Sequence, residues 1–247
     1  MDDRFTLTRR SVLAGGAAAG AGAAALAATG SLPGPLQSLL PGSEPIPVAV
    51  LMDDRATMID FAGPWEVFQD TGVANVPGFS LYTVAATGEP LRTTGSGDGI
   101  GPRRERSGLK FIPDYTFADA PQPRLLFMGA QAGRTNVAKR DWIRTVAAKA
   151  DIVMSVCTGA FVLANTGLID GLSATTHHDF YDSFEKQFPK VKLVRGTRFV
   201  DNGKFISAGG LTSGVDGALH VVQRYYGAAV AQQVADYMEY QSSGWKA

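Results

Sequence analysis

Four short strand-like runs recur along this chain of 247 residues, and most of them are almost entirely apolar. A short apolar run without alternation is typical of a strand that is buried on both faces, as in a parallel sheet. Apolar residues return at helical spacing after the third run, at Ile143, Val146 and Ala150. Strands that alternate with helices predict an α/β sandwich in which helices cover both faces of a mainly parallel sheet. The four runs span residues 47–52, 79–84, 124–128 and 152–156.

Turn and cap signals divide the rest of the chain into helices and loops. Pro64 suits the first turn of a helix that follows the first strand. A polar, Gly-rich stretch at residues 92–108 indicates a loop or hairpin on the surface. The pair Asn202 and Gly203 between two apolar runs predicts a β-hairpin. Further helices are expected at residues 136–150, 159–166, 180–188, 214–226 and 228–240.

The N-terminal segment has the features of an export address. Arg9 and Arg10 precede a weakly apolar Ala/Gly run at residues 14–28, which predicts a cleavable twin-arginine signal. The alternative is a membrane anchor, but a run of mostly Ala and Gly would insert only marginally. No cysteine follows the run, which excludes a lipid anchor. We therefore expect a signal at residues 1–30, a linker at 31–46, a domain at 47–247, and a periplasmic or secreted protein that meets the membrane only during export.

The charge balance argues against a nucleic-acid partner. Lys plus Arg and Asp plus Glu number 23 each, so the formal net charge is zero, and the pI is about 6.8. The single cysteine excludes an internal disulfide and a Cys-rich zinc site. A chain of this length buries a full hydrophobic core, so we expect an enzyme or a binder of small molecules.

Cys157 lies where the fourth strand ends and a helix begins. Ser155 and Gly159 flank it at the spacing of a nucleophile elbow, a turn that needs small neighbours. A thiol there faces a helix N-terminus, which favours the thiolate. The other interpretation is that Cys157 is a small hydrophobic core residue, but such a cysteine is expected inside a strand rather than at its exit. The position favours a reactive thiol.

Asp60 and the paired histidines are further candidates with open alternatives. Asp60 follows the first strand, on the same edge of the sheet as Cys157, and is either an acid with a raised pKa or a helix N-cap. His177 is either the partner of a Cys–His pair or a group that bonds the backbone of its loop. Metal binding by His177 and His178 is not expected, because neighbouring residues point in different directions.

Five short motifs run in the same order as in a known family and span residues 47–240. They are Ile-Asp-Phe-Ala-Gly-Pro-Trp-Glu-Val at 59–67, Ser-Val-Cys-Thr-Gly-Ala at 155–160, Leu-Ala with Gly-Leu at 163–168, Ala-Thr-Thr-His at 174–177 and Ser-Ala-Gly-Gly-Leu-Thr-Ser-Gly-Val-Asp at 207–216. In these motifs the chain resembles the ThiJ/PfpI family of the class I glutamine-amidotransferase-like superfamily, and within it the members that hydrate isonitriles.

The resemblance implies a flavodoxin-like three-layer sandwich, usually a homodimer, that works without metal or organic cofactor. It implies that Cys157 is the nucleophile, Asp60 the essential acid and Thr158 the threonine beside the cysteine. The reaction it implies is hydration of a small, uncharged isonitrile to an N-substituted formamide. It also implies a substrate pocket at Gly129, Ala130, His177 and His178, with Gly129 as a backbone donor near the thiol.

Three departures from the family pattern bear on the substrate. Ala130 replaces a glycine, His178 replaces a common aromatic residue, and the export leader is foreign to the cytoplasmic isonitrile-hydrating enzyme. Alternatives on the same scaffold are another thiol hydrolase or amidase, an aldehyde-handling enzyme, and a non-enzymatic ligand-binding or redox-sensing protein. Related sequences also occur fused to DNA-binding domains, but the balanced charge and the end of the sequence soon after the last expected helix disfavour a transcriptional role.

Overall fold

The computed structural model describes residues 42–94 and 108–246. The expected export signal at residues 1–30, most of the expected linker, and residues 95–107 of the stretch at 92–108 lie outside the described residues. No helix among the described residues combines the length and the apolar character needed to cross a membrane.

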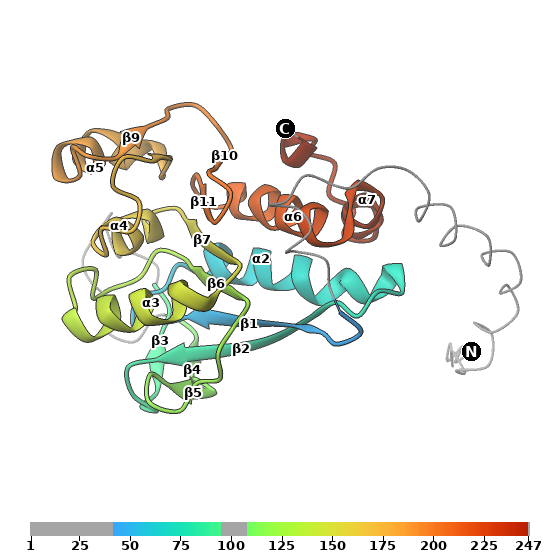
Figure 1. Cartoon of the computed structure of the whole chain (residues 1–247), viewed down its shortest axis with the longest axis horizontal. Helices are drawn as coiled ribbons and strands as arrows, with labels where there is room; N and C mark the ends of the chain where they lie inside the picture. The colour runs from blue at the N-terminus through green and yellow to red at the C-terminus, as the bar shows by residue number, and fades with distance from the viewer. Residues whose placement is uncertain (1–41, 95–107, 247) are drawn as a thin grey trace, which may run out of the picture. The chain divides into compact units, whose positions relative to one another are not determined.

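A seven-stranded sheet forms the centre of the domain, and its strands are parallel except at one edge (Figure 1). The antiparallel edge is the hairpin expected at Asn202 and Gly203, where Gly203 takes a positive φ of 81°. The four strand-like runs form β1, β2, β6 and β7, which confirms those predictions. In spatial order the strands are β10 (Phe199–Asp201), β11 (Phe205–Ala208), β7 (Ile152–Val156), β6 (Leu125–Met128), β1 (Ile46–Leu51), β2 (Phe79–Ala85) and β5 (Tyr115–Thr116).

Helices cover both faces of the sheet, as the alternation of strands and helices predicts. Val48 and Val50 of β1 pack in one apolar cluster, whereas Ala49 and Leu51 pack in a second cluster on the opposite face. The first cluster includes residues of α2 (Met58–Gln69), α6 (Ser213–Tyr226) and α7 (Ala228–Tyr237), which lie side by side in Figure 1. The second includes residues of α3 (Val137–Lys149), α4 (Gly159–Ala164) and α5 (Tyr181–Gln187). The domain is therefore a three-layer α/β sandwich.

Short elements connect these layers, and most were not predicted because two or three residues carry no periodic signal. Two small sheets pair β3 (Leu91–Arg92) with β4 (Lys110–Phe111), antiparallel, and β8 (Ser173–Ala174) with β9 (Lys192–Leu193), parallel. Single 3₁₀ turns are η1 (Asp70–Ala74), η2 (His178–Phe180) and η3 (Gly244–Lys246).

The first helix begins earlier than Pro64 indicates. Pro64 lies inside α2, which starts at Met58 after the extended residue Thr57. Proline has no N–H, so Pro64 cannot donate to the carbonyl of the residue four positions earlier, Asp60. Pro64 is the seventh residue of α2, so only a few helical residues precede it, and its side chain is buried. The prediction was wrong by one and a half turns, and the correction places Asp60 inside the helix.

Candidate active site

A cavity of about 570 Å³ opens at the carboxyl ends of the central strands. β1, β6 and β7 are neighbours in the sheet, and the loops that follow them bring Thr57, Ala130 and Cys157 to the cavity wall. Ligand sites of open α/β sheets form at this edge. The full set of lining residues is Arg55, Thr57, Thr94, Ala130, Gln131, Ala132, Gly133, Arg134, Cys157, Thr158, His177, Phe180 and Leu211.

Cys157 forms a tight strand-to-helix turn between β7 and α4. Its φ is +57°, a left-handed conformation that is uncommon for a residue with a side chain. The backbone N–H donates to the carbonyls of Ala208 (3.1 Å) and Gly209 (2.8 Å), and the Thr176 hydroxyl donates to the Cys157 carbonyl (2.8 Å). A Cβ at Gly159 would lie 2.5 Å from the Met128 carbonyl oxygen, so only glycine fits there. This geometry agrees with the elbow expected from the sequence.

Asp60 is the third residue of α2, and its side chain is fully buried. Its Oδ2 accepts a hydrogen bond from the Ala130 N–H (3.0 Å). No hydrogen bond of normal geometry reaches Oδ1 from the described residues. The N-cap position belongs to Thr57, so the N-cap interpretation of Asp60 is wrong. Gly129 permits the approach of the two segments, because a Cβ on Gly129 would lie 2.8 Å from the Asp60 Cβ.

The Asp60 carboxyl and the Cys157 thiol are electrostatically linked. Burial raises the pKa of Asp60 to about 6, against hydrogen bonds from the backbone of Ala130, the thiol of Cys157 and the backbone of Leu211, which lower it. Burial and the negative charge of Asp60 raise the pKa of Cys157 to about 12, while the backbone N–H groups of Thr158 and Leu211 lower it. The pair therefore holds one proton at neutral pH and carries one negative charge.

The expected thiolate at Cys157 is not the resting form of this site. α4 has only six residues, Gly159–Ala164, so the partial charge at its N-terminus is small. Burial of the sulfur and the nearby carboxylate outweigh that charge. The thiol therefore keeps its proton at neutral pH.

Two groups near this pair were not predicted from the sequence. The backbone N–H of Leu211 lowers the pKa of both Asp60 and Cys157, and Leu211 lines the cavity with a positive φ of 52°. Arg134, in the loop after β6, donates from Nη2 to the Thr158 hydroxyl oxygen (3.0 Å). Arg134 follows a predicted strand at the same edge as Cys157, and that position is the only sequence signal for it.

Only some of the expected pocket residues line the cavity. Thr158 and Ala130 line the cavity. Gly129 is not part of the cavity wall, and the backbone donors next to the sulfur are Thr158 and Leu211 instead. Gly129 acts through its small size, as described above. His178 is 73% exposed in its side chain and does not line the cavity.

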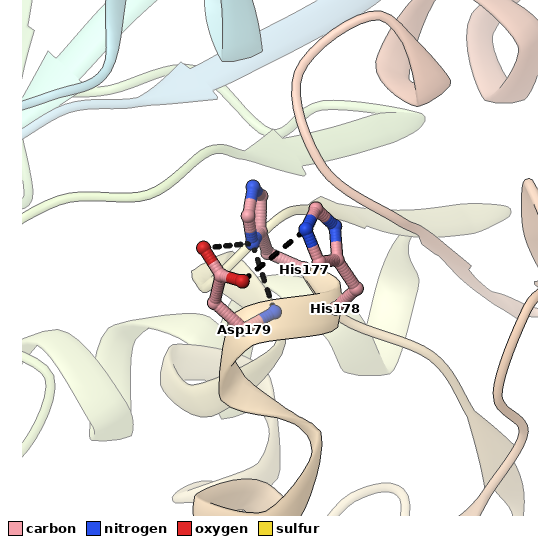
Figure 2. Close-up of side chains that lie close together, drawn as sticks. All are labelled: His177, His178 and Asp179. Atoms are coloured by element: carbon pink, nitrogen blue, oxygen red, sulfur yellow. Dashed lines mark hydrogen bonds and ion pairs between the residues drawn. The ribbon is translucent and has the colours of Figure 1, made fainter.

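His177, His178 and Asp179 form one local cluster, in which both imidazoles lie close to the carboxylate (Figure 2). The two rings stack with centroids 4.4 Å apart. The His177 Nδ1 accepts a hydrogen bond from the Asp179 N–H (3.2 Å), and burial lowers the pKa of His177. Ligand atoms of the three residues lie within 4.8 Å of one another, so this group could hold a metal ion. The expectation that the two neighbouring histidines point in different directions is therefore wrong.

No hydrogen bond joins either histidine to Cys157 in the described part of the chain. His177 instead bonds the backbone of its own loop, as one of the two interpretations of the sequence has it. The group that faces the thiol is the Asp60 carboxyl. The arrangement therefore supports acid–thiol chemistry rather than a Cys–His pair.

Comparisons with known proteins agree with this architecture. Residues 47–224 match the DJ-1/PfpI family. The chain is 29% identical over 198 residues to isonitrile hydratase of Pseudomonas putida, covering 78% of each sequence. It is 28% identical to the HTH-type transcriptional regulator CdhR of Pseudomonas aeruginosa, covering 68% of this chain and 54% of the regulator, so it spans about half the length of that protein.

Solved structures show the same fold. A ThiJ/PfpI family protein from Pseudomonas syringae superposes with a TM-score of 0.67 at 24% identity, over 86% of this chain and 83% of that chain. The sandwich is therefore of the flavodoxin-like kind found in these proteins, as expected from the sequence.

Proposed function

Since the chain belongs to the DJ-1/PfpI family, we propose that it is a cysteine-dependent enzyme that hydrates an isonitrile to an N-substituted formamide. The observation that carries the proposal is the geometry of Cys157, whose left-handed backbone aims a thiol at a cavity beside a buried carboxyl. The similarity to an isonitrile hydratase over 78% of the chain supports the reaction.

The first step would move the thiol proton through Asp60. The carboxylate accepts the proton of Cys157 as the sulfur attacks the terminal carbon of the isonitrile, and a new S–C bond forms. Asp60 then returns the proton to that carbon, which gives a thioimidate, R–N=CH–S–Cys. A pKa of about 6 suits this exchange, because the carboxylate is a base at neutral pH and its acid form still gives the proton up.

Water completes the reaction. It adds to the thioimidate carbon and its proton passes to nitrogen, giving R–NH–CH(OH)–S–Cys. The C–S bond then breaks, the carbonyl forms, and the thiol regains a proton from the hydroxyl group through Asp60. The sum is R–NC plus water to R–NH–CHO. The N–H groups of Thr158 and Leu211, which lower the pKa of Cys157, stabilise the negative charge that develops on the sulfur.

Turnover of a simple isonitrile tests this function. Purified protein with cyclohexyl isonitrile should produce the formamide, detected by NMR of the formyl proton, and Cys157→Ala should produce none. Absence of formamide with several isonitriles, both neutral and negatively charged, would exclude the proposed reaction.

A ligand-binding role is the second candidate, because several relatives are transcriptional regulators. A binding domain has no need of a thiol held in a left-handed turn next to a buried acid. Redox sensing fits less well, because sensor cysteines are exposed and have lowered pKa values, whereas the pKa of Cys157 is raised by burial. Binding of the same isonitriles without turnover would support the binding role.

A further inference from the structure

The cavity beside Cys157 is lined by positive charge, and no carboxylate is among its described lining residues. Arg55, in the loop after β1, and Arg134, in the loop after β6, both line the wall. Within the described ranges neither guanidinium forms an ion pair with a carboxylate, whereas six other arginines do. A cavity with unpaired cations favours an anionic ligand.

Arg134 is held firmly at the wall. Its guanidinium carbon lies 4.8 Å from the ring centroid of Phe161 and 5.8 Å from that of Phe180. The Asn165 side chain donates to the Arg134 carbonyl (3.1 Å), which fixes the backbone. One of the five N–H donors of the guanidinium bonds Thr158, and the others have no protein partner in the described part. A half-buried guanidinium fixed in this way suits bidentate binding of a carboxylate.

The position of Arg134 limits where the anion would sit. Arg134 bonds the side chain of Thr158, the residue next to the nucleophile, so a bound anion would lie close to the reacting carbon. Asp60 carries the opposing negative charge, but it is fully buried and is not part of the cavity wall. An anionic group is therefore favoured on the Arg134 side of the sulfur and disfavoured on the Asp60 side.

Taking the hydration reaction proposed above as given, we propose that the substrates carry a small oxyanion, a carboxylate near the isonitrile carbon, and that Arg134 binds it. This replaces the uncharged substrate expected from the sequence. In α-isocyano carboxylates such as isocyanoacetate, a single carbon separates the carboxylate from the isonitrile nitrogen. Arg55 adds positive charge at the rim and attracts the ligand without fixing it.

Alkylation of the single cysteine tests the anion site without any hydratase turnover. Iodoacetate and iodoacetamide differ only in charge, and with either the S–C bond forms, iodide leaves and the thiol proton is lost to solvent. The quantity compared is the rate constant for iodoacetate divided by the rate constant for iodoacetamide. We expect this ratio to be about tenfold higher at Cys157 than for 2-mercaptoethanol in the same buffer, which is the effect of one favourable ion pair in a desolvated site. Mass spectrometry of the intact protein gives both rates.

Variants distinguish the effect of Arg134 on this ratio from the effect of the overall charge of the protein. Arg134→Gln should lower the ratio to within about threefold of the ratio for 2-mercaptoethanol. Arg134→Lys should keep part of the preference for iodoacetate, because it keeps the positive charge. Arg195→Gln is the matched control, since Arg195 pairs with Asp182 and Glu185 away from the cavity, and should leave the ratio unchanged. Rates must not change in dilute urea, which shows that the native protein reacts.

A measurement on the unaltered protein complements the variants. Acetate at millimolar concentration should slow alkylation by both reagents, and acetamide should not. The anion site is rejected if the wild-type ratio equals that of the free thiol, if Arg134→Gln leaves a raised ratio unchanged, or if acetate does not protect.

Failure of the reaction and failure of the anion site give different results. A raised ratio without turnover of isocyanoacetate would reject the hydration reaction but support the carboxylate site. Turnover of cyclohexyl isonitrile, together with a ratio equal to that of 2-mercaptoethanol, would reject the carboxylate site but support the hydration reaction. If both hold, Arg134→Gln raises KM for isocyanoacetate at least tenfold and leaves KM for its methyl ester within about twofold.

Discussion

The buried Asp60 carboxyl lies beside the Cys157 thiol, and the interaction between them shifts the two pKa values in opposite directions. It lowers the pKa of Asp60, which burial has raised, and it raises the pKa of Cys157 further. The thiol is therefore protonated at rest, and the Asp60 carboxylate is the group that must take its proton before the sulfur can react. The contact links the reactivity of the sulfur to the charge of one carboxyl group.

Asp60→Asn should make the thiol more reactive and the enzyme less active. Removal of the negative charge lowers the pKa of Cys157, so alkylation by iodoacetamide at pH 8 should be about tenfold faster, one pKa unit. Formamide production should fall about 10²-fold or more, because the proton relay is lost. The pH dependence of alkylation gives the first value. Glu89→Gln, at an exposed carboxylate, should change neither.

Stability should fall as the pH rises through the titration of Asp60. The pKa is 3.8 for the unfolded group and about 6 in the fold, so the folded state binds the proton more tightly. That contribution is present below pH 3.8 and is lost as the pH passes 6. The free energy of unfolding of Asp60→Asn should therefore be roughly 1–3 kcal/mol higher than that of the parent at pH 7.5, and it should not be higher at pH 4. Urea titrations at both pH values measure this, and an equal gain at both would contradict the assignment.

Gly159→Ala should disrupt the turn at the thiol. The added Cβ would lie 2.5 Å from the Met128 carbonyl oxygen, which is backbone and cannot move aside without shifting β6. We expect a loss of about 1–3 kcal/mol in the free energy of unfolding, together with a loss of activity. Gly72→Ala is the control, because a Cβ added at Gly72 would meet nothing within 4 Å. Equal stability of the two variants would mean that the close approach does not constrain the turn.

Asp53→Asn should destabilise the domain far more than loss of a surface ion pair. The Lys139 Nζ lies 2.6 Å from Asp53 and its side chain is 2% exposed, so the variant leaves a buried ammonium group without its partner. The expected cost is about 3–5 kcal/mol. Asp170→Asn breaks the exposed pair with Lys190 and should cost less than about 1 kcal/mol. Denaturant unfolding of both variants makes the comparison.

We propose that the protein is exported by the twin-arginine route, and the paired arginines carry that proposal. Replacing Arg9 and Arg10 together by lysine should leave uncleaved precursor inside the cell. Gel mobility of the protein in cell fractions measures processing, with Arg4→Lys as the control. Normal export and cleavage of the double variant would rule the route out.

The strands and the elbow could be predicted from the sequence because each carries a local signal. β1, β6 and β7 are continuous apolar runs, and Cys157 has small residues at fixed offsets. Pro64 misled the placement of α2, because proline is typical of a first turn but is also tolerated deeper in a helix. The ionisation of Cys157 depends on Asp60, almost a hundred residues away, and on burial, which no local pattern reports.

Arg134 and Leu211 show the other limit of sequence reasoning. Both lie in loops, and their relation to Cys157 arises only when the ends of β6, β7 and β11 meet at one edge of the sheet. Leu211 acts through its backbone N–H, for which side-chain identity gives no signal. The family resemblance implies a hydrogen-bonding role for Gly129, whereas in the fold its lack of a side chain is what lets Asp60 approach.

The left-handed backbone at Cys157 has a consequence for how this position changes during evolution. A residue with a Cβ costs about 1–2 kcal/mol in that conformation, and glycine does not. A descendant that no longer uses the sulfur is relieved of that cost by a change to glycine, so drift under selection for stability favours the change. A cysteine retained at this turn in a related lineage therefore marks one in which the thiol is still in use.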